Sequence, residues 1–87
     1  MRNSDHLEIR KAFNRARQLK FVRTYRGYSQ SELCKNIKGL SQSNLSKFEK
    51  FGSHISDEKL EEIMKFLDWP FAFLDKRIGN LDFSHSF

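Results

Sequence analysis

The chain of 87 residues is poor in cysteine and proline and has no long hydrophobic run. Its one cysteine, Cys34, cannot form a disulfide within the chain, and a place between Leu33 and Ile37 in a helical pattern favours a reduced, packed thiol. No apolar stretch approaches the ~18 residues that a membrane span requires. Residues 1–13 carry charge throughout, which excludes a secretory signal. These absences predict a cytoplasmic protein.

The residue clusters that support catalysis or hold a metal are also missing. His6, His54 and His85 lie far apart, without cysteines or acids at ligand spacing. The sequence contains no nucleophile paired with a base and no glycine-rich phosphate loop. We therefore expect neither an enzyme nor a cofactor or metal site.

Positive charge is concentrated toward the N-terminus. Residues 1–28 contain eight Lys/Arg and two acids, residues 29–52 contain four Lys and two Glu, and residues 53–87 contain four bases and seven acids. This division of the net charge of +5 suits a domain that presents one face to a polyanion. A solvated basic helix would have the same composition.

Apolar periodicity predicts a single all-α domain at residues 13–78, compact and built from five helices. The preceding residues 1–12 form either a basic arm or a short helix, and the pattern does not decide between the two. Residues 79–87 contain aromatics without periodicity and are interpreted as a C-terminal tail.

The first helix of this domain is expected to begin at an Asn14 N-cap and to run to about Arg26. Gly27 then ends it. Its apolar positions recur at three-residue spacing, at Ala16, Leu19 and Val22.

Ser29 and Glu32 have the Ser-x-x-Glu spacing of a capping box, which predicts a short second helix from Gln30. Gly39 supplies the turn after it. Ser41 is placed to cap a third helix at residues 42–51, which Gly52 ends.

Two short capped helices separated by residues 37–40 have the layout of a helix-turn-helix, in which the second helix enters the major groove of DNA. At ~100° per residue, the polar residues of this second helix share one face and its apolar residues share the opposite face. Glu49 projects away from the polar face. Gln42, Ser43 and Lys47 are therefore the candidates for contacts with base edges.

A fourth helix is expected after an N-cap at Ser56, and a fifth from Phe71 to about Ile78, with Pro70 at its start. The fourth helix has a core-facing pattern at Leu60, Ile63, Met64 and Leu67.

The segments Arg23–Leu33 (RTYRGYSQSEL) and Leu40–Glu49 (LSQSNLSKFE), followed by Gly52, strongly resemble the Cro and phage-repressor-like helix-turn-helix family, also called the xenobiotic-response-element family. The resemblance covers roughly residues 13–74. Residues 55–60 and 67–74 look more particularly like a subgroup that is often fused to a zinc-peptidase domain. No His-Glu-x-x-His motif is present, so the resemblance implies no peptidase activity.

The resemblance implies a transcriptional regulator, typically a repressor, that binds operator DNA as a symmetric dimer. Gln42, Ser43 and Lys47 match base-contacting positions of the family. Gln30 matches a residue that bonds a phosphate and braces the first residue of the recognition helix. Arg23 and Glu49 match an internal ion pair, for which we expect a structural role.

Further basic and polar side chains are candidates for phosphate contacts, which would make DNA affinity depend on salt. They are Ser46, Lys50, Lys38, Arg26 and Lys35, and in the N-terminal part of the chain Arg10, Lys11 and Arg15.

Two positions depart from the family pattern. The turn at residues 37–40 is one residue longer than usual, so Lys38 points either toward the DNA backbone or, as we expect, into solvent. Phe51 replaces a small polar residue and is expected to pack under the fourth helix.

An alternative function is a protein-interaction module of the antitoxin type, which would bind a partner such as a toxin or a peptidase through aromatic residues of the C-terminal half. For Trp69, Phe71 and Phe73 we favour ordinary core or dimer contacts over contacts with such a partner. The residues are Trp69, Phe71, Phe73, Phe83 and Phe87.

Overall fold

The computed structural model describes the backbone of residues 2–76 and the side chains from residue 9 onward. This part of the chain contains four α-helices and one 3₁₀ helix, and no strand. The all-α prediction is therefore confirmed. The elements are α1 (Arg2–Tyr25), α2 (Gln30–Asn36), α3 (Gln42–Phe51), α4 (Asp57–Phe66) and the 3₁₀ helix η1 (Phe71–Asp75).

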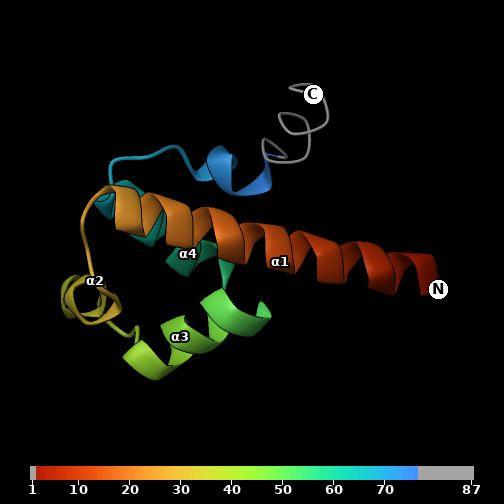
Figure 1. The fold of residues 1–87 in the computed structure, drawn as a ribbon, viewed down its shortest axis with the longest axis horizontal. Coiled ribbons are helices and arrows are strands. Elements are labelled where there is room, and N and C mark those ends of the chain that lie inside the picture. Colours follow the sequence, from red (N-terminus) through yellow and green to blue (C-terminus); the bar gives the residue numbers. More distant parts are fainter. Residues whose placement is uncertain (1, 77–87) are drawn as a thin grey trace.

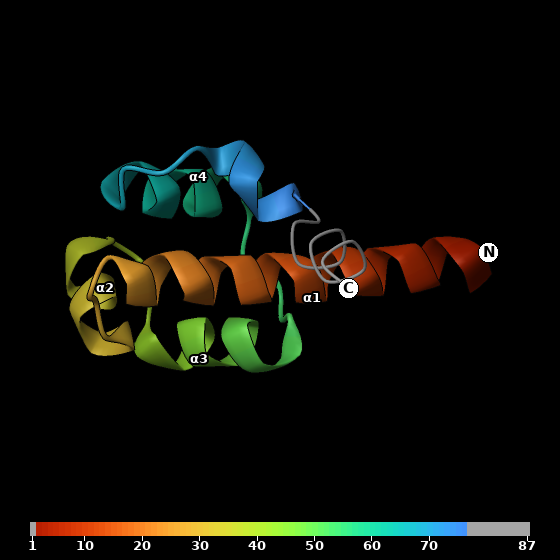
Figure 2. The same cartoon turned by 45° about the horizontal axis from the view of Figure 1, so that its top comes forward.

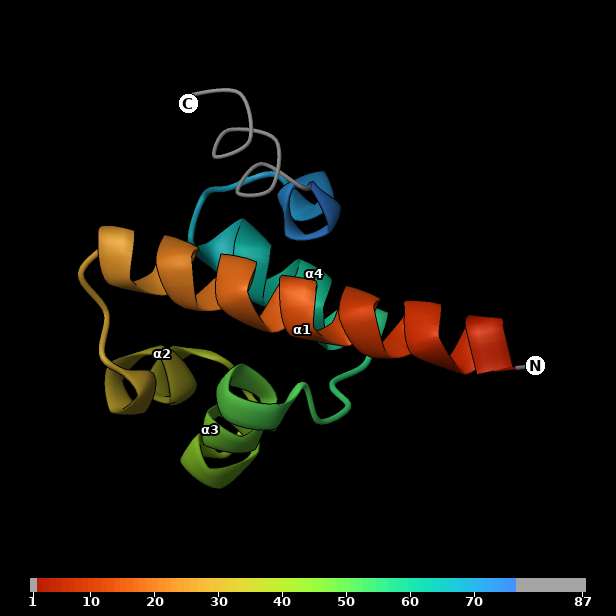
Figure 3. The ribbon, with the colours of Figure 1, turned by 45° about the vertical axis from the view of Figure 1, so that its right-hand side comes forward.

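The long helix α1 runs through the middle of the molecule (Figure 1). Helix α3 lies on one side of α1, whereas α4 and η1 lie on the other, as Figures 2 and 3 show from two directions. The N-terminal half of α1 extends beyond the other helices (Figure 1). None of the helices in residues 2–76 combines the length and the apolar character needed to cross a membrane.

The core forms where α1 is enclosed by the other elements. The apolar faces predicted for the first, third and fourth helices are buried, as is Leu74 from η1. Each of these side chains removes apolar surface from water, which stabilises the fold by roughly 1.5–3 kcal/mol for a residue the size of Leu. The most buried members are Ala16, Leu19, Val22, Leu33, Leu45, Leu60, Ile63, Met64 and Leu74.

The start of the first helix was predicted wrongly. Helix α1 begins at Arg2, so residues 2–12 are neither an arm nor a separate helix, but continue into residues 13–25 without a break. Asn14 lies inside α1, and its amide donates to the carbonyl oxygens of Leu74 (3.0 Å) and Lys76 (3.2 Å). An asparagine that serves tertiary hydrogen bonds was thus mistaken for an N-cap.

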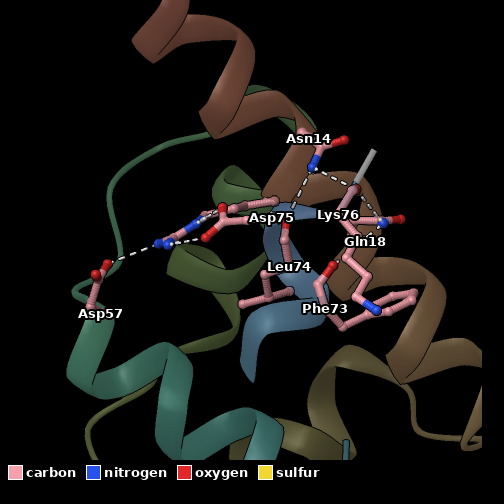
Figure 4. Close-up of polar contacts among 8 residues, drawn as sticks. Asn14, Gln18, Asp57, Phe73, Leu74, Asp75 and Lys76 are labelled. Atoms are coloured by element: carbon pink, nitrogen blue, oxygen red, sulfur yellow. Dashed lines mark hydrogen bonds and ion pairs between the residues drawn. The ribbon is translucent and has the colours of Figure 1, made fainter. Parts of the chain in front are cut away.

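The fifth helix also differs from the prediction. It is a 3₁₀ helix that ends at Asp75, and Pro70 precedes it with an extended backbone. Lys76 is extended as well, and its carbonyl accepts hydrogen bonds from Asn14 and from Gln18 of α1 (Figure 4). These bonds hold the chain in a conformation that cannot continue the helix. Residues 77–78 and the predicted tail at 79–87 lie outside the described residues.

Candidate functional site

Helix α2 begins with the predicted capping box. The Ser29 hydroxyl accepts from the Glu32 amide at 3.0 Å, and the Glu32 carboxylate accepts from the Ser29 amide at 2.8 Å. These hydrogen bonds lower the pKa of Glu32. Leu33, in the same turn, is buried and fixes the inner face of α2.

A tight turn joins α2 to α3. The Leu40 amide donates to the Ile37 carbonyl at 3.3 Å, and Gly39 has φ +80° at the third position, as a type II turn requires. The Lys38 side chain is exposed, and its carbonyl accepts from Nζ of Lys59 on α4 at 2.6 Å. The turn with the additional residue is therefore connected to α4 by a hydrogen bond.

Helix α3 has the two faces that its sequence predicts. Ser41 caps it by accepting from the Asn44 amide at 3.1 Å, and Leu45 and Phe48 are buried. The opposite face is polar and carries no acidic side chain. Its members are Gln42, Ser43, Lys47 and Lys50, which are exposed, and Ser46, which is half-buried.

Glu49 is the only acidic residue of α3, and it points inward. Its carboxylate accepts from Nε of Arg23 at 2.7 Å and from Nη2 of Arg23 at 2.8 Å, so the predicted ion pair is present. Arg23 also donates to the Tyr28 carbonyl at 2.7 Å. Because the carboxylate is buried in these contacts, α3 presents no negative charge on its outer face.

Gln30 lies next to this ion pair. Its amide donates to Oε1 of Glu49 at 3.0 Å. The resemblance implies instead a contact with the first residue of α3, Gln42. In the structure Gln30 therefore supports α3 through Glu49, near the end of the helix and not at its start.

Arg15 was assigned wrongly to the phosphate contacts. Its guanidinium is buried and donates to Asp75 through Nε (2.8 Å) and Nη2 (2.9 Å), and to Asp57 through Nη1 (2.8 Å) (Figure 4). It also lies 5.3 Å from the centre of the Phe71 ring. The hydrogen bonds from Arg15 lower the pKa of Asp75. Arg15 thus joins α1, α4 and η1, and its buried guanidinium is held by two carboxylates of this chain.

Arg26 is a second correction among the predicted phosphate contacts. Its guanidinium donates to the carbonyls of Leu67 (2.8 Å) and Asp68 (2.9 Å) and stacks over Trp69 at 4.9 Å. Asp68 has φ +57° and ends α4 in the left-handed conformation usually filled by glycine. Arg26 therefore caps the C-terminus of α4, on the opposite side of α1 from α3.

The prediction that Phe51 packs under α4 is wrong. It is the last residue of α3, and its side chain is exposed. The following residue, Gly52, lies against Ala12 of α1 instead. The remaining predicted phosphate contacts, Arg10, Lys11 and Lys35, are exposed.

The aromatic residues near the C-terminus pack partly against the core. Trp69, Phe71 and Phe73 are half-buried, and two of these rings meet two exposed rings of α1. Trp69 lies 5.4 Å from both Tyr25 and Phe73, and Phe21 lies 6.1 Å from Phe73. We call Phe21, Tyr25, Trp69 and Phe73 the aromatic cluster. Phe83 and Phe87 lie outside the described residues.

Charges of opposite sign lie on opposite sides of α1. Helix α3, which carries the exposed Lys47 and Lys50, lies on one side of α1 (Figure 2). Helix α4 lies on the other side and carries four exposed acids, Asp57, Glu58, Glu61 and Glu62. Comparison with protein-family models, with curated proteins and with solved structures finds no match to this chain.

Proposed function

We propose that this protein binds duplex DNA sequence-specifically as a transcriptional regulator, with α2 and α3 as a helix-turn-helix and α3 in the major groove. One observation carries the proposal: α3 exposes amide, hydroxyl and ammonium groups while its single carboxylate, Glu49, is buried. An exposed acid there would repel the DNA phosphates.

The side chains on this face have the chemistry of base readout. Gln42 can bond both N6 and N7 of adenine, Lys47 can donate to guanine, and Ser43 can bond either base. We assign Lys50, Lys38, Ser46 and Gln30 to the phosphates. Helix α4, which carries exposed acidic side chains, lies on the opposite side of α1 from α3, and this favours the same docking direction.

The resemblance to the phage-repressor-like family supports repression at an operator with two half-sites, bound by a homodimer. Two-fold symmetry of the protein would then match two-fold symmetry of the DNA.

The test is selection of bound sequences from a random DNA pool, followed by binding measurements with the Gln42→Ala/Lys47→Ala variant. We expect this variant to lose sequence preference but to keep weak nonspecific binding. Lys76→Ala is the matched charge control, because this exposed lysine follows η1 on the far side of α1. Full specificity in a folded Gln42→Ala/Lys47→Ala variant would exclude α3 as the reading helix.

A second candidate function is binding of a protein partner, such as a toxin or a peptidase, through the aromatic cluster. The observation in its favour is the exposure of Phe21 and Tyr25, because large exposed aromatic side chains that lie together are typical of interaction sites. In this case Phe21→Ser/Tyr25→Ser would abolish association with one identified partner, and Gln42→Ala/Lys47→Ala would leave it intact.

A further inference from the structure

An open groove with an apolar floor and an acidic rim lies along α4. Its apolar lining consists of Met64 of α4, Trp69 and Pro70 between the two helices, and Phe71 of η1. Four acids and one lysine line its rim, so the groove carries a net negative charge. The rim residues are Glu58, Glu61, Glu62, Lys65 and Asp68.

Residues 9–17 of α1 have the complementary character. Ile9 and Phe13 are 54% and 45% exposed and lie one helical turn apart on the same face. Arg10 and Arg17 are also exposed and project within about 60° of Phe13. The start of α1 extends beyond the remaining helices (Figure 1). Because all four side chains are exposed, this basic, apolar face is open to a second molecule.

We propose that the α4 groove binds residues 9–17 of α1 from a second copy of this chain, and that the two copies exchange this contact reciprocally. The charges are complementary, and each surface offers apolar side chains between its charges. The lengths also match, because Ile9 to Arg17 of α1 and Glu58 to Phe66 of α4 each span ~12 Å of helix. A reciprocal contact closes a two-fold dimer and leaves neither surface free.

The location of this interface keeps it separate from the proposed DNA contact. The groove is lined by residues of α4 and η1, and these two helices lie on the opposite side of α1 from α3 (Figure 2). The inference deepens the proposed function by assigning an interface to its homodimer. Dimerisation is measured without DNA, and DNA binding is measured separately, so that the interface and the DNA contact can each fail alone.

The experiment is a charge exchange followed by sedimentation velocity over a range of protein concentrations. One variant carries Arg10→Glu/Arg17→Glu, and the other carries Glu58→Lys/Glu61→Lys. Each alone places like charges against each other in both contacts, and we expect its dimer to dissociate at least tenfold more readily than the wild-type dimer. An equimolar mixture restores opposite charges at both contacts, so it should dimerise like the wild type.

Circular dichroism establishes that each variant is folded, and Gln42→Ala/Lys47→Ala should dimerise normally. Three results would overturn the proposal: a wild-type chain that stays monomeric, single-surface variants that dimerise as well as the wild type, or folded variants that fail to pair when mixed. As a second readout, Phe13→Ser changes no charge and should also weaken the dimer, because it removes the apolar contact.

Discussion

Arg23 and Glu49 form a bidentate ion pair between α1 and α3, with Nε to Oε2 at 2.7 Å and Nη2 to Oε1 at 2.8 Å. The two side chains are only 8% and 3% exposed. Glu49→Ala would leave the Arg23 charge buried without its partner. We therefore expect the free energy of unfolding to fall by about 3–5 kcal/mol, measured by urea denaturation.

The control is the double variant Arg23→Met/Glu49→Leu, which removes both charges and fills the space with apolar atoms. It should be more stable than Glu49→Ala. If Glu49→Ala had the same midpoint of urea denaturation as the wild type, the ion pair would not stabilise the packing of α3 on α1.

The bridge between Arg15 and Asp75 should make stability depend on pH. Its hydrogen bonds lower the pKa of Asp75 from the ordinary value of 3.8, so the stabilisation is complete above the pKa of the unfolded chain and is lost as the pH falls through the folded value. The stability difference between the wild type and Asp75→Asn should therefore shrink from about pH 5 downward. Asp75 is 41% exposed, so solvent screening keeps this difference modest. A difference that stays constant down to acid pH would contradict the prediction.

Gly52 and Gly27 provide a matched pair of glycine substitutions. Both have positive φ, +71° and +85°, so alanine at either position incurs a strain of about 1–2 kcal/mol. A Cβ on Gly52 would also lie 3.2 Å from the Ala12 Cβ and 3.3 Å from its carbonyl carbon, whereas nothing lies within 4 Å at Gly27. Gly52→Ala should thus lower the free energy of unfolding more than Gly27→Ala. If urea denaturation showed equal losses in the free energy of unfolding, α1 would be able to shift at Ala12 without an energetic cost.

Arg26→Ala should lower stability without changing DNA recognition. It removes two charge-assisted hydrogen bonds to the C-terminus of α4 and the stacking on Trp69. Because the side chain is partly solvated, we expect a loss of about 1–2 kcal/mol in the free energy of unfolding. Affinity of the folded variant for the selected DNA, measured by fluorescence anisotropy, should be that of the wild type. If the folded Arg26→Ala variant bound this DNA more weakly than the wild type, Arg26 would have to be assigned to the phosphate contacts after all.

Lys50 is exposed at the end of α3 and is assigned to a phosphate. Lys50→Ala should reduce the dependence of log K on log salt by about 0.9, because one fewer counterion is released on binding. Titrations at several salt concentrations measure this slope, with Lys76→Ala as the control of equal charge. The assignment fails if the two variants have the same slope.

Features set by neighbouring residues were predictable from the sequence. The capping box at Ser29, the caps at Ser41 and Ser56 and the buried faces of α3 and α4 depend on residues within a few positions of one another, and all are present. The pair of Arg23 and Glu49 is 26 positions apart, and only the resemblance to a known family indicated it.

Long-range contacts account for most of the errors. Arg15 meets Asp75 across 60 positions and Asp57 across 42 positions. Asp68 ends α4 in place of a glycine, and Arg26 donates hydrogen bonds to the carbonyls at this end of the helix. Arg26 is too distant in the sequence for a local pattern to predict this contact. Asparagine is a residue type preferred at helix N-caps, but the amide of Asn14 donates to two carbonyls in a distant segment.

The three-way contact of Arg15 also bears on how the chain folds in time. Its two carboxylate partners are 42 and 60 positions away, so the chain must close long loops before either bond can form. Individual helices form within about a microsecond, long before such closures. Contacts made after the rate-limiting step govern the rate of unfolding and leave the rate of folding almost unchanged. The bridge would therefore form late in folding, slow the unfolding of the native state and so lengthen its lifetime.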